Sequence, residues 1–344
     1  MQSSFFGSRK TVYKIAEIGG NHEGNYDEAL RLTQLAIDCN VDAIKFQIYS
    51  GGTLVNKNID EQRHAHFKKF ELSVDEYKSL SLICASNDIA FLASVWDQEL
   101  FDTFIPDMPL IKIGSGDANC FPFIEKLMFF QKPLLISTGL CSLDEVDEIV
   151  NFVDSVDPCF RQQNLLCLLQ CTSMYPIPFE EANLSVVDLY RNRYGVPVGY
   201  SDHTVGTIAL ELAISRGVDV IEFHFTDSRI SRTFRDHQVS LLPSEVLQLN
   251  DYEFKVNELM GTQQKNPTRS EEASGHLTSF RRSVYASRTI LKGQRITNDD
   301  LILLRPSVDS SLKYYYSIIG SIALSDIYPL EPVLAHLSFL LLPK

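Results

Sequence analysis

Short, almost continuous apolar segments recur along the first two thirds of the chain, and longer segments of different periodicity separate them. The apolar segments are KIAEIG (14–19), AIKFQIY (43–49), AFLASV (90–95), LIKIGSG (110–116), LLISTG (134–139), LLCLLQCTS (165–173), VPVGYSD (196–202) and DVIEFHFT (219–226). Segments this short and this apolar are typical of parallel strands that are covered on both faces. The intervening segments, such as 26–40 and 142–156, repeat apolar residues every three or four positions, which predicts amphipathic helices.

The number of these units predicts the fold of the first domain. Eight strand–helix units within about 230 residues match an α/β protein of the (β/α)8 TIM-barrel type. A doubly wound open sheet is the alternative, but it usually has fewer strands at this length. A helix predicted at 244–260 ends the unit, and we assign residues 1–262 to the barrel domain.

A second, smaller domain is predicted after a polar linker. The stretch GTQQKNPTRSEEASGH (261–276) is rich in turn-forming residues, and we place the linker at 263–279. The following RRSVYASRTILKGQRITNDDLILLRP contains short strand patterns, a KGQ turn and a helix cap at Thr297. We therefore expect a small β-rich domain at 280–344, in which LAHLSFLLLPK (334–344) is a packed strand or a tail.

Composition and charge exclude several classes of protein. Hydrophobic residues make up 44% of the 344 residues, which is too high for a disordered chain. The net charge of −13 argues against nucleic-acid binding and against anionic membranes, so a site for an anion must supply its own positive charge. The seven cysteines have no CxxC spacing and are expected to be buried free thiols. The segment MQSSFFGSRK does not resemble a signal peptide and no apolar stretch approaches a membrane span, so we expect a cytoplasmic protein.

The polar residues at the ends of the predicted strands define a candidate site. In a barrel of this type the active site lies at the C-terminal ends of the strands. The residues at these ends are Glu17, Lys45, Gln47, Ser94, Lys112, Ser115, Asp117, Ser137, Thr138, Thr172, Ser173, Tyr175, Ser201, Asp202, His203, Glu222 and His224. Lys45 and Lys112 would form a basic pocket, and neighbouring serines would add donors suited to a phosphate or a carboxylate. The alternative is that each lysine pairs with a strand carboxylate such as Glu17 or Glu222.

Two histidines end neighbouring predicted strands and form a candidate metal site. His203 and His224 could bring their imidazoles together, and Asp236 and His237 follow shortly after. Imidazole ligands with open water positions suit Mn, Zn, Fe or Co, and such a metal could polarise a carbonyl. Hydrogen-bonded core histidines are the alternative reading of the same pattern.

Three other motifs have mainly structural interpretations. The sequence GSG (114–116) predicts a tight turn, which could point backbone amides at an anion. NHEGN (21–25) is read as a βα loop with a helix cap. EQRHAHFKK (61–69) is read as a solvated face of a helix, and not as part of a site.

Taken in order along the chain, several motifs resemble the sialic acid synthase family, which includes N-acetylneuraminate synthases. The matching stretches are KIAEIGGNHEGN, DAIKFQIY, KIGSGDANCFPFIEK, ISTGL, LQCTSMYP, VGYSDHTVG, EFHFTD and DHQVSLLPSE. The stretch RRSVYASRTILKGQRITNDDL is similar to the antifreeze-like (SAF) domain of the family. The resemblance covers nearly the whole chain.

The resemblance implies an activity and a set of partners. Enzymes of this family condense phosphoenolpyruvate with an N-acylated mannosamine-type sugar aldehyde, and they release a nine-carbon 2-keto sugar acid and inorganic phosphate. A divalent metal is implied, Mn²⁺ before Mg²⁺ or Co²⁺. A homodimer is also implied, in which the C-terminal domain of one subunit covers the barrel of its partner.

The resemblance also assigns roles to individual residues. It implies that Glu17, Asp117, Lys45 and Lys112 are catalytic and that His203 and His224 bind the metal. Phosphoenolpyruvate would be held by Lys45, Ser94, Lys112, Ser115, Ser137, Ser173 and Ser201. The sugar would contact Gln47, Tyr175, Asp236 and an arginine of the partner's C-terminal domain, for which Arg305 is the first candidate and Arg282 the second.

The sequence departs from the family pattern at several positions, and these leave alternatives open. Relatives often have Glu at the position of Asp117, a basic residue at Phe223 and Asn at Ser173, and a glycine-containing turn after Arg305-Pro306 is missing here. The acceptor is therefore open between N-acetylmannosamine, its 6-phosphate and the diacetamido sugar that gives legionaminic acid. Two other classes of protein compete with this interpretation. One is a different metal-dependent aldolase or isomerase on the same barrel, and the other is a non-catalytic sugar-binding protein.

Overall fold

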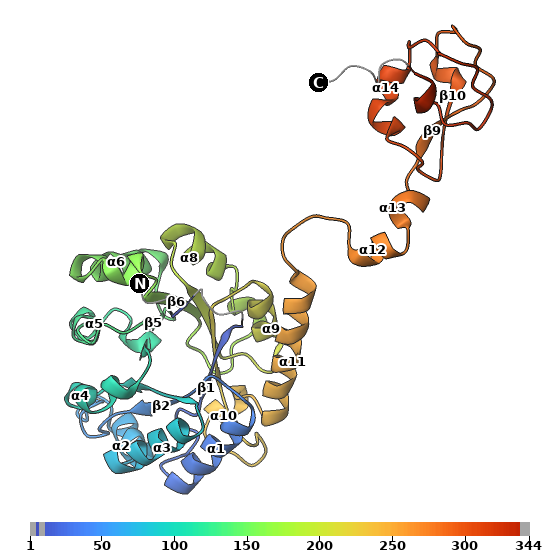
Figure 1. Cartoon of the computed structure of the whole chain (residues 1–344). Helices are drawn as coiled ribbons and strands as arrows, with labels where there is room; N and C mark the ends of the chain where they lie inside the picture. Colours follow the sequence, from blue (N-terminus) through green and yellow to red (C-terminus); the bar gives the residue numbers. More distant parts are fainter. Residues whose placement is uncertain (1–4, 7–10, 338–344) are drawn as a thin grey trace. The chain divides into compact units, whose positions relative to one another are not determined.

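The computed structural model describes residues 5–6 and 11–337, and its first unit is an eight-stranded parallel barrel (Figure 1). The strand order is β3-β2-β1-β8-β7-β6-β5-β4, and contacts between β3 and β4 close the ring. The strands are β1 (Tyr13–Glu17), β2 (Ala43–Ile48), β3 (Ala90–Val95), β4 (Ile111–Ile113), β5 (Leu134–Ser137), β6 (Leu166–Cys171), β7 (Val198–Asp202) and β8 (Val220–His224). Each lies within one of the eight predicted apolar segments, except that β1 begins one residue earlier, so the predicted TIM barrel is confirmed.

The strands form where they do because both of their faces are covered by other elements. Every residue of β5, β6, β7 and β8 is buried, which is why these strands read as continuous apolar runs and not as alternating ones. The few polar residues within them cluster at their C-terminal ends. The sheet therefore collects its buried polar side chains at one end of the barrel.

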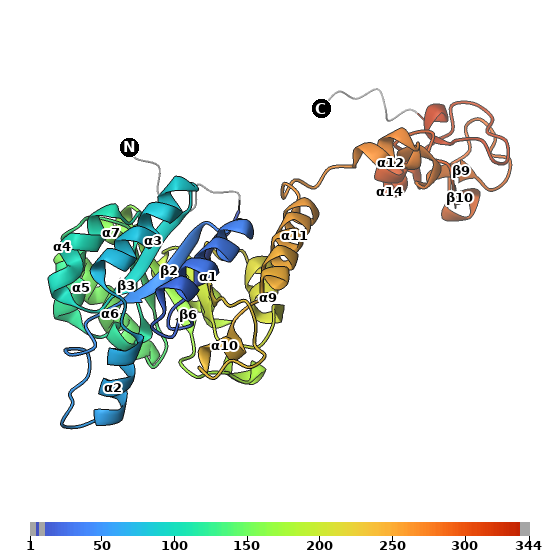
Figure 2. The same ribbon diagram turned by 90° about the horizontal axis from the view of Figure 1, so that it is seen from below.

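The helices of the first unit lie outside the strands (Figures 1 and 2). They are α1 (Tyr26–Asp38), α2 (Glu61–Phe70), α3 (Val74–Ser86), α4 (Phe101–Phe104), α5 (Phe121–Met128), α6 (Leu143–Val156), α7 (Cys159–Gln162), α8 (Val186–Tyr194), α9 (Ile208–Ser215), α10 (Asp236–Val239) and α11 (Pro243–Met260). Short 3-10 turns lie at Gln98–Leu100, Ile105–Asp107, Ser115–Asp117 and Phe179–Glu181. The predicted helix at 244–260 is confirmed as α11.

Local sequence signals fix where the longer helices begin. The side chain of Asn25 accepts from the backbone amides of Asp27 and Glu28 and caps α1. Helix α3 begins with a reciprocal capping box between Ser73 and Glu76, and α6 begins with another after Ser142. These caps satisfy amides that the first helical turn leaves without partners.

The second compact unit begins at Gly261 and has a hydrophobic core of its own. Its elements are α12 (Arg269–Ala273), α13 (His276–Ser279), β9 (Ser283–Ala286), a 3-10 turn at Asn298–Asp300, β10 (Leu301–Leu304), a 3-10 turn at Ser311–Tyr314, α14 (Tyr315–Ile318) and a 3-10 turn at Leu334–His336. Strands β9 and β10 pair antiparallel, and Thr297 caps only the short 3-10 turn that follows it. The expected strand or tail at the C-terminal end extends beyond Leu337 and so lies partly outside the described residues.

Two sequence-based expectations about the chain as a whole can be compared with the structure. All seven cysteines are free, as expected, but Cys120 is exposed, and Cys141 and Cys159 are partly exposed, so the expectation of general burial is wrong for these three. In the described part of the chain, none of the helices combines the length and the apolar composition that a bilayer crossing requires.

Candidate functional site

A large cavity opens at the C-terminal ends of the barrel strands. Its volume is about 1420 Å³, and residues from every strand end or from the loop that follows contribute to its wall. The candidates that line it are Glu17, Lys45, Gln47, Ser94, Lys112, Ser115, Asp117, Ser137, Ser173, Tyr175, Ser201, His203, Glu222, His224 and Asp236. The structure thus brings together all the barrel residues that the sequence nominated for substrate or metal.

Strand register explains why these side chains meet. Glu17 is the register partner of Lys45 on one side and of His224 on the other. Ser201 stands opposite Glu222 across the β7–β8 pair. Because neighbouring residues in a parallel sheet point to the same face, these pairs all project toward the same end of the barrel.

The two lysines are joined by buried carboxylates at the floor of the cavity. Lys45 forms an ion pair with Glu17, and its Nζ lies 3.9 Å from Oε2 of Glu222. The Nζ of Lys112 lies 3.6 Å from Oε1 of Glu222, which also accepts from Ser201 Oγ at 3.1 Å. The alternative raised by the sequence, that each lysine pairs with a strand carboxylate, is therefore what the structure contains. Such pairing is what makes buried ammonium groups tolerable, and it leaves both groups at the cavity wall.

Burial and mutual charge act differently on the two carboxyl groups. Burial raises the pKa of Glu17 from 4.5 to about 7, although the ammonium group of Lys45 opposes this shift. Burial acts to raise the pKa of Glu222 as well, but Lys112 and Lys45 together outweigh it and lower that pKa. Glu222 therefore remains the counter-ion of both lysines, while Glu17 can gain or lose a proton near neutral pH.

Serine hydroxyls surround the lysine side of the cavity. Ser94 Oγ lies 3.5 Å from Lys45 Nζ, and the hydroxyl of Ser137 is buried without a hydrogen-bond partner in the described structure. Ser115 accepts from the backbone amide of Gly139 at 3.1 Å. A Cβ at Gly139 would lie 2.5 Å from Ser173 Oγ and 2.7 Å from Ser115 Oγ, so the glycine is required for the two serines to approach each other. The unpaired hydroxyl of Ser137 indicates a place for a hydrogen-bonding ligand.

His203 and His224 lie side by side at the same mouth. Their ring centroids are 5.3 Å apart, and the ring of Tyr175 packs 4.0 Å from His203. His203 donates from Nδ1 to the carbonyl of Thr172 at 2.7 Å, which leaves its Nε2 with a lone pair. Nδ1 of His224 is buried, has no hydrogen-bond partner among the described residues, and lies 3.9 Å from Oδ2 of Asp236.

These two imidazoles fit the ligand chemistry of a divalent metal. Burial lowers the pKa of both histidines, and for His224 the neighbouring His203 adds to the effect, so both rings are held neutral as metal ligation requires. Among residues 5–6 and 11–337 there is no cluster of three or more His, Cys, Asp or Glu arranged to hold a metal. The pair therefore fits an open site with two protein ligands, in which water and substrate fill the other positions.

The remaining candidates lie around the outer part of the cavity. Gln47 donates to Glu17 Oε1 at 3.1 Å, and burial raises the pKa of Asp117. The guanidinium of Arg235 lies 4.8 Å above the ring of Tyr175, and its Nε lies 3.3 Å from Asp236 Oδ1. Polar and aromatic groups thus share this outer region, which is typical of a small-molecule site.

Some sequence-based interpretations need correction. The segment 61–69 forms helix α2 as predicted, but Arg63, His66 and Phe67 line the cavity, so its interpretation as a purely solvated face is wrong. His66 and Phe67 follow Arg63 by three and four residues, which places all three on one face of the helix. This spacing was the sequence signal that could have predicted a shared role for them. His237 is fully buried and is not among the residues that line the cavity.

The C-terminal arginines lie in the second unit. Arg305 is exposed there, with its guanidinium 5.9 Å from the ring centroid of Phe280, and Arg282 donates to the carbonyl of Leu303 at 2.7 Å. Their expected role toward a partner's barrel stays a prediction.

Sequence reasoning did not assign several cavity residues to the site. The sequence places Glu222 among the polar strand ends and as a counter-ion but assigns it no role toward substrate or metal, although it lies close to both lysines. Trp96 and Phe234 come from loops that carry no recognisable motif, and only the folding of the chain brings them to the cavity. Their aromatic side chains in polar loop segments were the one signal that could have drawn attention to them.

Comparisons with known proteins show which families and proteins this chain is similar to. The sequence profile described as NeuB family matches residues 32–265, and that of the SAF domain matches residues 281–337. The chain is 33% identical to an N,N'-diacetyllegionaminic acid synthase from Legionella pneumophila, over 92% of this chain and 91% of the relative. It is also 33% identical to an N-acetylneuraminate-9-phosphate synthase from Mus musculus, over 86% and 83%.

A solved structure shares both sequence and fold with the chain. The N-acetylneuraminic acid synthetase from Leptospira borgpetersenii, solved in complex with citrate, superposes with a TM-score of 0.70 at 27% identity. The match covers 77% of this chain and 90% of the other.

Proposed function

The chain belongs to the NeuB family and carries a SAF domain, and we propose that it is a sialic acid synthase that condenses phosphoenolpyruvate with an N-acylated mannosamine-type sugar. The products would be a nine-carbon 2-keto sugar acid and inorganic phosphate. The first two relatives named above act, by their names, in the formation of legionaminic acid and of N-acetylneuraminate 9-phosphate. The phosphate-release test with three different sugars distinguishes between these acceptor sugars.

The observation that carries the proposal is the pair of buried lysines beside a neutral histidine pair. Lys45 and Lys112 provide two ammonium groups within a chain of net charge −13, and Glu222 holds both in place. The hydroxyls of Ser94, Ser137 and the other serines named above surround them. This combination suits a small molecule that carries both a phosphate and a carboxylate, as phosphoenolpyruvate does.

The proposed chemistry follows from where the groups lie. C3 of phosphoenolpyruvate attacks the aldehyde carbon of the sugar, and a new carbon–carbon bond forms as the π bond of the carbonyl breaks. The carbonyl oxygen becomes an alkoxide, which then gains the proton that Glu17 removes from water in the next step. Positive charge develops at C2, water adds there, and Glu17 takes the proton of that water because its pKa lies at about 7. The tetrahedral product then loses phosphate by cleavage of the C2–O bond, while Lys45 and Lys112 stabilise the departing charge.

His203 and His224 would hold a divalent metal, for which we propose Mn²⁺ first and Mg²⁺ or Co²⁺ as substitutes. When bound, this ion supplies Lewis acidity toward the carbonyl oxygen of the sugar. The chain's own residues orient the acceptor: the ring of Tyr175 packs on His203, and Asp236 lies beside His224. Gln47 donates to Glu17 and lines the cavity, and we propose that it contacts the sugar as well.

The test is release of inorganic phosphate from phosphoenolpyruvate in the presence of Mn²⁺. It is run with no sugar, with N-acetylmannosamine, with its 6-phosphate and with the 2,4-diacetamido mannose analogue, each with and without a chelator. Release that requires both a sugar and the metal supports the synthase and identifies the acceptor. A carbon–carbon bond formed without phosphate release would instead indicate an aldolase, and tight binding without turnover would indicate a binding protein.

A further inference from the structure

The loop after β1 contributes a buried asparagine that none of the proposed chemistry uses. Asn21 is 1% exposed and belongs to the NHEGN motif, which the sequence explained only as a βα loop with a cap. The cap is made by Asn25, so it gives no reason for an asparagine at position 21. The contacts of Asn21 give a different reason for it.

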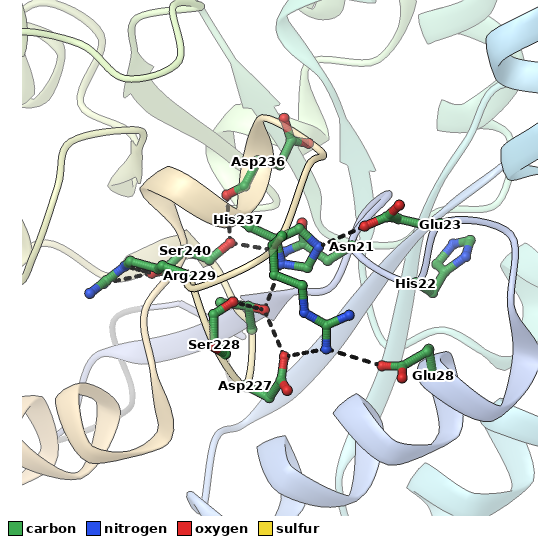
Figure 3. A network of polar contacts seen from close by, with 12 residues as sticks. Asn21, His22, Glu23, Glu28, Asp227, Ser228, Arg229, Asp236, His237 and Ser240 are labelled. Carbon is green, nitrogen blue, oxygen red and sulfur yellow. Dashed lines mark hydrogen bonds and ion pairs between the residues drawn. The ribbon is translucent and has the colours of Figure 1, made fainter.

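The amide nitrogen of Asn21 makes two hydrogen bonds to the segment that follows β8. It donates to the carbonyl of Phe225 at 2.9 Å and to the hydroxyl of Ser240 at 2.8 Å. Ser240, which is fully buried, donates in turn to the carbonyl of Asp236 at 2.7 Å. Figure 3 shows Asn21, Ser240 and Asp236 in this polar network.

The donor and acceptor roles in this chain are determined. A carbonyl oxygen can only accept, so the group of Asn21 that faces Phe225 must be the amide nitrogen. The single hydrogen of Ser240 is used toward Asp236, so Ser240 must accept from Asn21. Within the described residues the amide oxygen of Asn21 is buried without a partner, so both side-chain hydrogen bonds of Asn21 are made by its amide nitrogen.

The two hydrogen-bond acceptors of Asn21, on Phe225 and Ser240, are each linked to a residue of the candidate site. Phe225 directly follows His224, and the Ser240 relay ends on the backbone of Asp236. The side chains of His224 and Asp236 lie 3.9 Å apart, from Nδ1 to Oδ2. We propose that Asn21 is a positioning residue that sets the separation of His224 and Asp236, and thereby orients the acceptor sugar, by bonding to Phe225 and to the Ser240–Asp236 relay.

A second contact between the same two segments makes the proposal testable without loss of the fold. Nε2 of His237 lies 3.4 Å from Oε1 of Glu23, and Nδ1 of His237 lies 2.7 Å from the hydroxyl of Thr226. The backbone amide of Leu241 also donates to the carbonyl of His224 at 2.7 Å. None of these contacts involves the side chain of Asn21, so we expect them to persist in a variant that lacks it.

The inference rests on the proposed function for its kinetic test. In Asn21→Ala we expect kcat/KM for the acceptor to fall by about tenfold or more, as for partners that orient ligating groups. The Kd for phosphoenolpyruvate should stay at the wild-type value, because Lys45 and Lys112 lie on β2 and β4 and make no contact with this relay. Ser240→Ala should cause a smaller change in the same direction, and it serves as the second variant if Asn21→Ala does not fold.

Asn250→Ala is the matched control. Asn250 also donates from its amide nitrogen to a backbone carbonyl, that of Cys39 at 2.9 Å, and its amide oxygen is also buried without a partner. It lies on α11, outside the cavity lining. The positioning role is refuted if Asn21→Ala, like Asn250→Ala, lowers only the melting temperature and keeps the kinetic constants of the wild type. It is also refuted if Asn21→Ala weakens phosphoenolpyruvate binding as much as it lowers kcat/KM for the acceptor sugar.

A crystal structure of Asn21→Ala tests the inference independently of activity. We expect the separation of His224 and Asp236 to change by about 1 Å, a displacement large enough to impair catalysis. An unchanged separation would overturn the inference even if the wild type is an active synthase. Absence of phosphate release by the wild type would contradict the proposed function alone, and the crystal structure would still decide the role of Asn21.

Discussion

The ammonium group of Lys112 lies 3.6 Å from the carboxylate of Glu222, and both groups are almost completely buried. Glu222 also lies 3.9 Å from Lys45, so one carboxylate serves two cations. Glu17, the other carboxyl group of the cluster, has a pKa raised to about 7 by burial. Burial also lowers the pKa of Lys112, so the two carboxyl groups and this lysine all lie where burial disfavours their charged forms. Two ammonium groups at one end of the barrel give an acidic chain a local place for a small anion.

Replacing Lys112 should weaken phosphoenolpyruvate binding without unfolding the barrel. Lys112→Met keeps most of the side-chain volume but removes one of the two ammonium groups, so we expect the Kd in calorimetric titration to rise by about tenfold or more. The control is Lys255→Met, which removes an exposed lysine of α11 that pairs with Asp251. Equal affinity of the Lys112 variant and the wild type would show that this lysine does not bind the substrate.

Removing His203 should reduce metal binding and turnover together. The ring of His203 is fixed by its bond to the carbonyl of Thr172, which directs the other nitrogen toward the proposed metal. In His203→Ala we expect the Mn²⁺ content after dialysis, measured by elemental analysis, to fall in step with phosphate release. His64→Ala on α2 is the control, since His64 is not among the cavity residues. Full wild-type activity after complete chelation would refute a metal role.

The titration of Glu17 should appear in the stability of the protein. Burial raises the pKa of Glu17 in the folded state from 4.5 to about 7, so the folded protein binds this proton more tightly than the unfolded chain does. The resulting stabilisation is complete below pH 4.5 and is lost as the pH rises past about 7. Between about pH 5 and pH 8 the melting temperature of the wild type should fall relative to that of Glu17→Gln. Glu258→Gln, at an exposed position of α11, should follow the wild type throughout.

A methyl group at Gly139 should disturb the serine side of the cavity. Its Cβ would lie 2.5 Å from Ser173 Oγ and 2.7 Å from Ser115 Oγ, so at least one hydroxyl must move. We expect Gly139→Ala to raise the Kd for phosphoenolpyruvate by severalfold while the protein remains folded. Gly52→Ala is the control, because the nearest atom to its Cβ would be 3.8 Å away. If both variants bind phosphoenolpyruvate as the wild type does, the serines do not contact it.

The C-terminal unit is expected to complete the acceptor site of a partner subunit. Each unit has its own hydrophobic core, so a chain ending near residue 265 should fold. Light scattering should give a homodimer for the full chain, and Arg305→Ala should lower kcat/KM for the acceptor without changing phosphoenolpyruvate binding. A shortened chain with full activity would contradict this arrangement.

The barrel fold, and the end of the barrel at which the candidate site lies, could be predicted from the sequence because both depend on local patterns of apolar and polar residues. Buried parallel strands are short apolar runs, and a polar residue at the end of such a run, such as Lys45 or His224, stands out against its neighbours. The topology of a barrel then fixes that all strand ends meet at one mouth. This is why the sequence could nominate the barrel residues that the structure places around one cavity.

Which groups pair inside that cavity was decided by the tertiary structure. The sequence left Lys45 and Lys112 either free for a ligand or paired with carboxylates, because it does not determine the distance between side chains on different strands. The register places Glu17 beside Lys45, and the barrel closure brings Glu222 between both lysines. The raised pKa of Glu17 follows from this burial and from no property of its sequence neighbours.

The sequence by itself determined the eight barrel strands, longer helices such as α1, α6 and α11, and the end of the barrel at which the polar side chains gather, since all of these depend on residue type and spacing. It did not show the short helices α12 and α13 within the predicted linker. It also supplied Asn21 and Ser240, but it could not show that they bond to each other, because they are separated by more than half of the chain. Hydrogen bonds between distant segments depend on atomic positions that only the packed fold provides. The helix cap in the NHEGN loop could therefore be predicted from the sequence, whereas the bond between Asn21 and Ser240 is visible only in the tertiary structure.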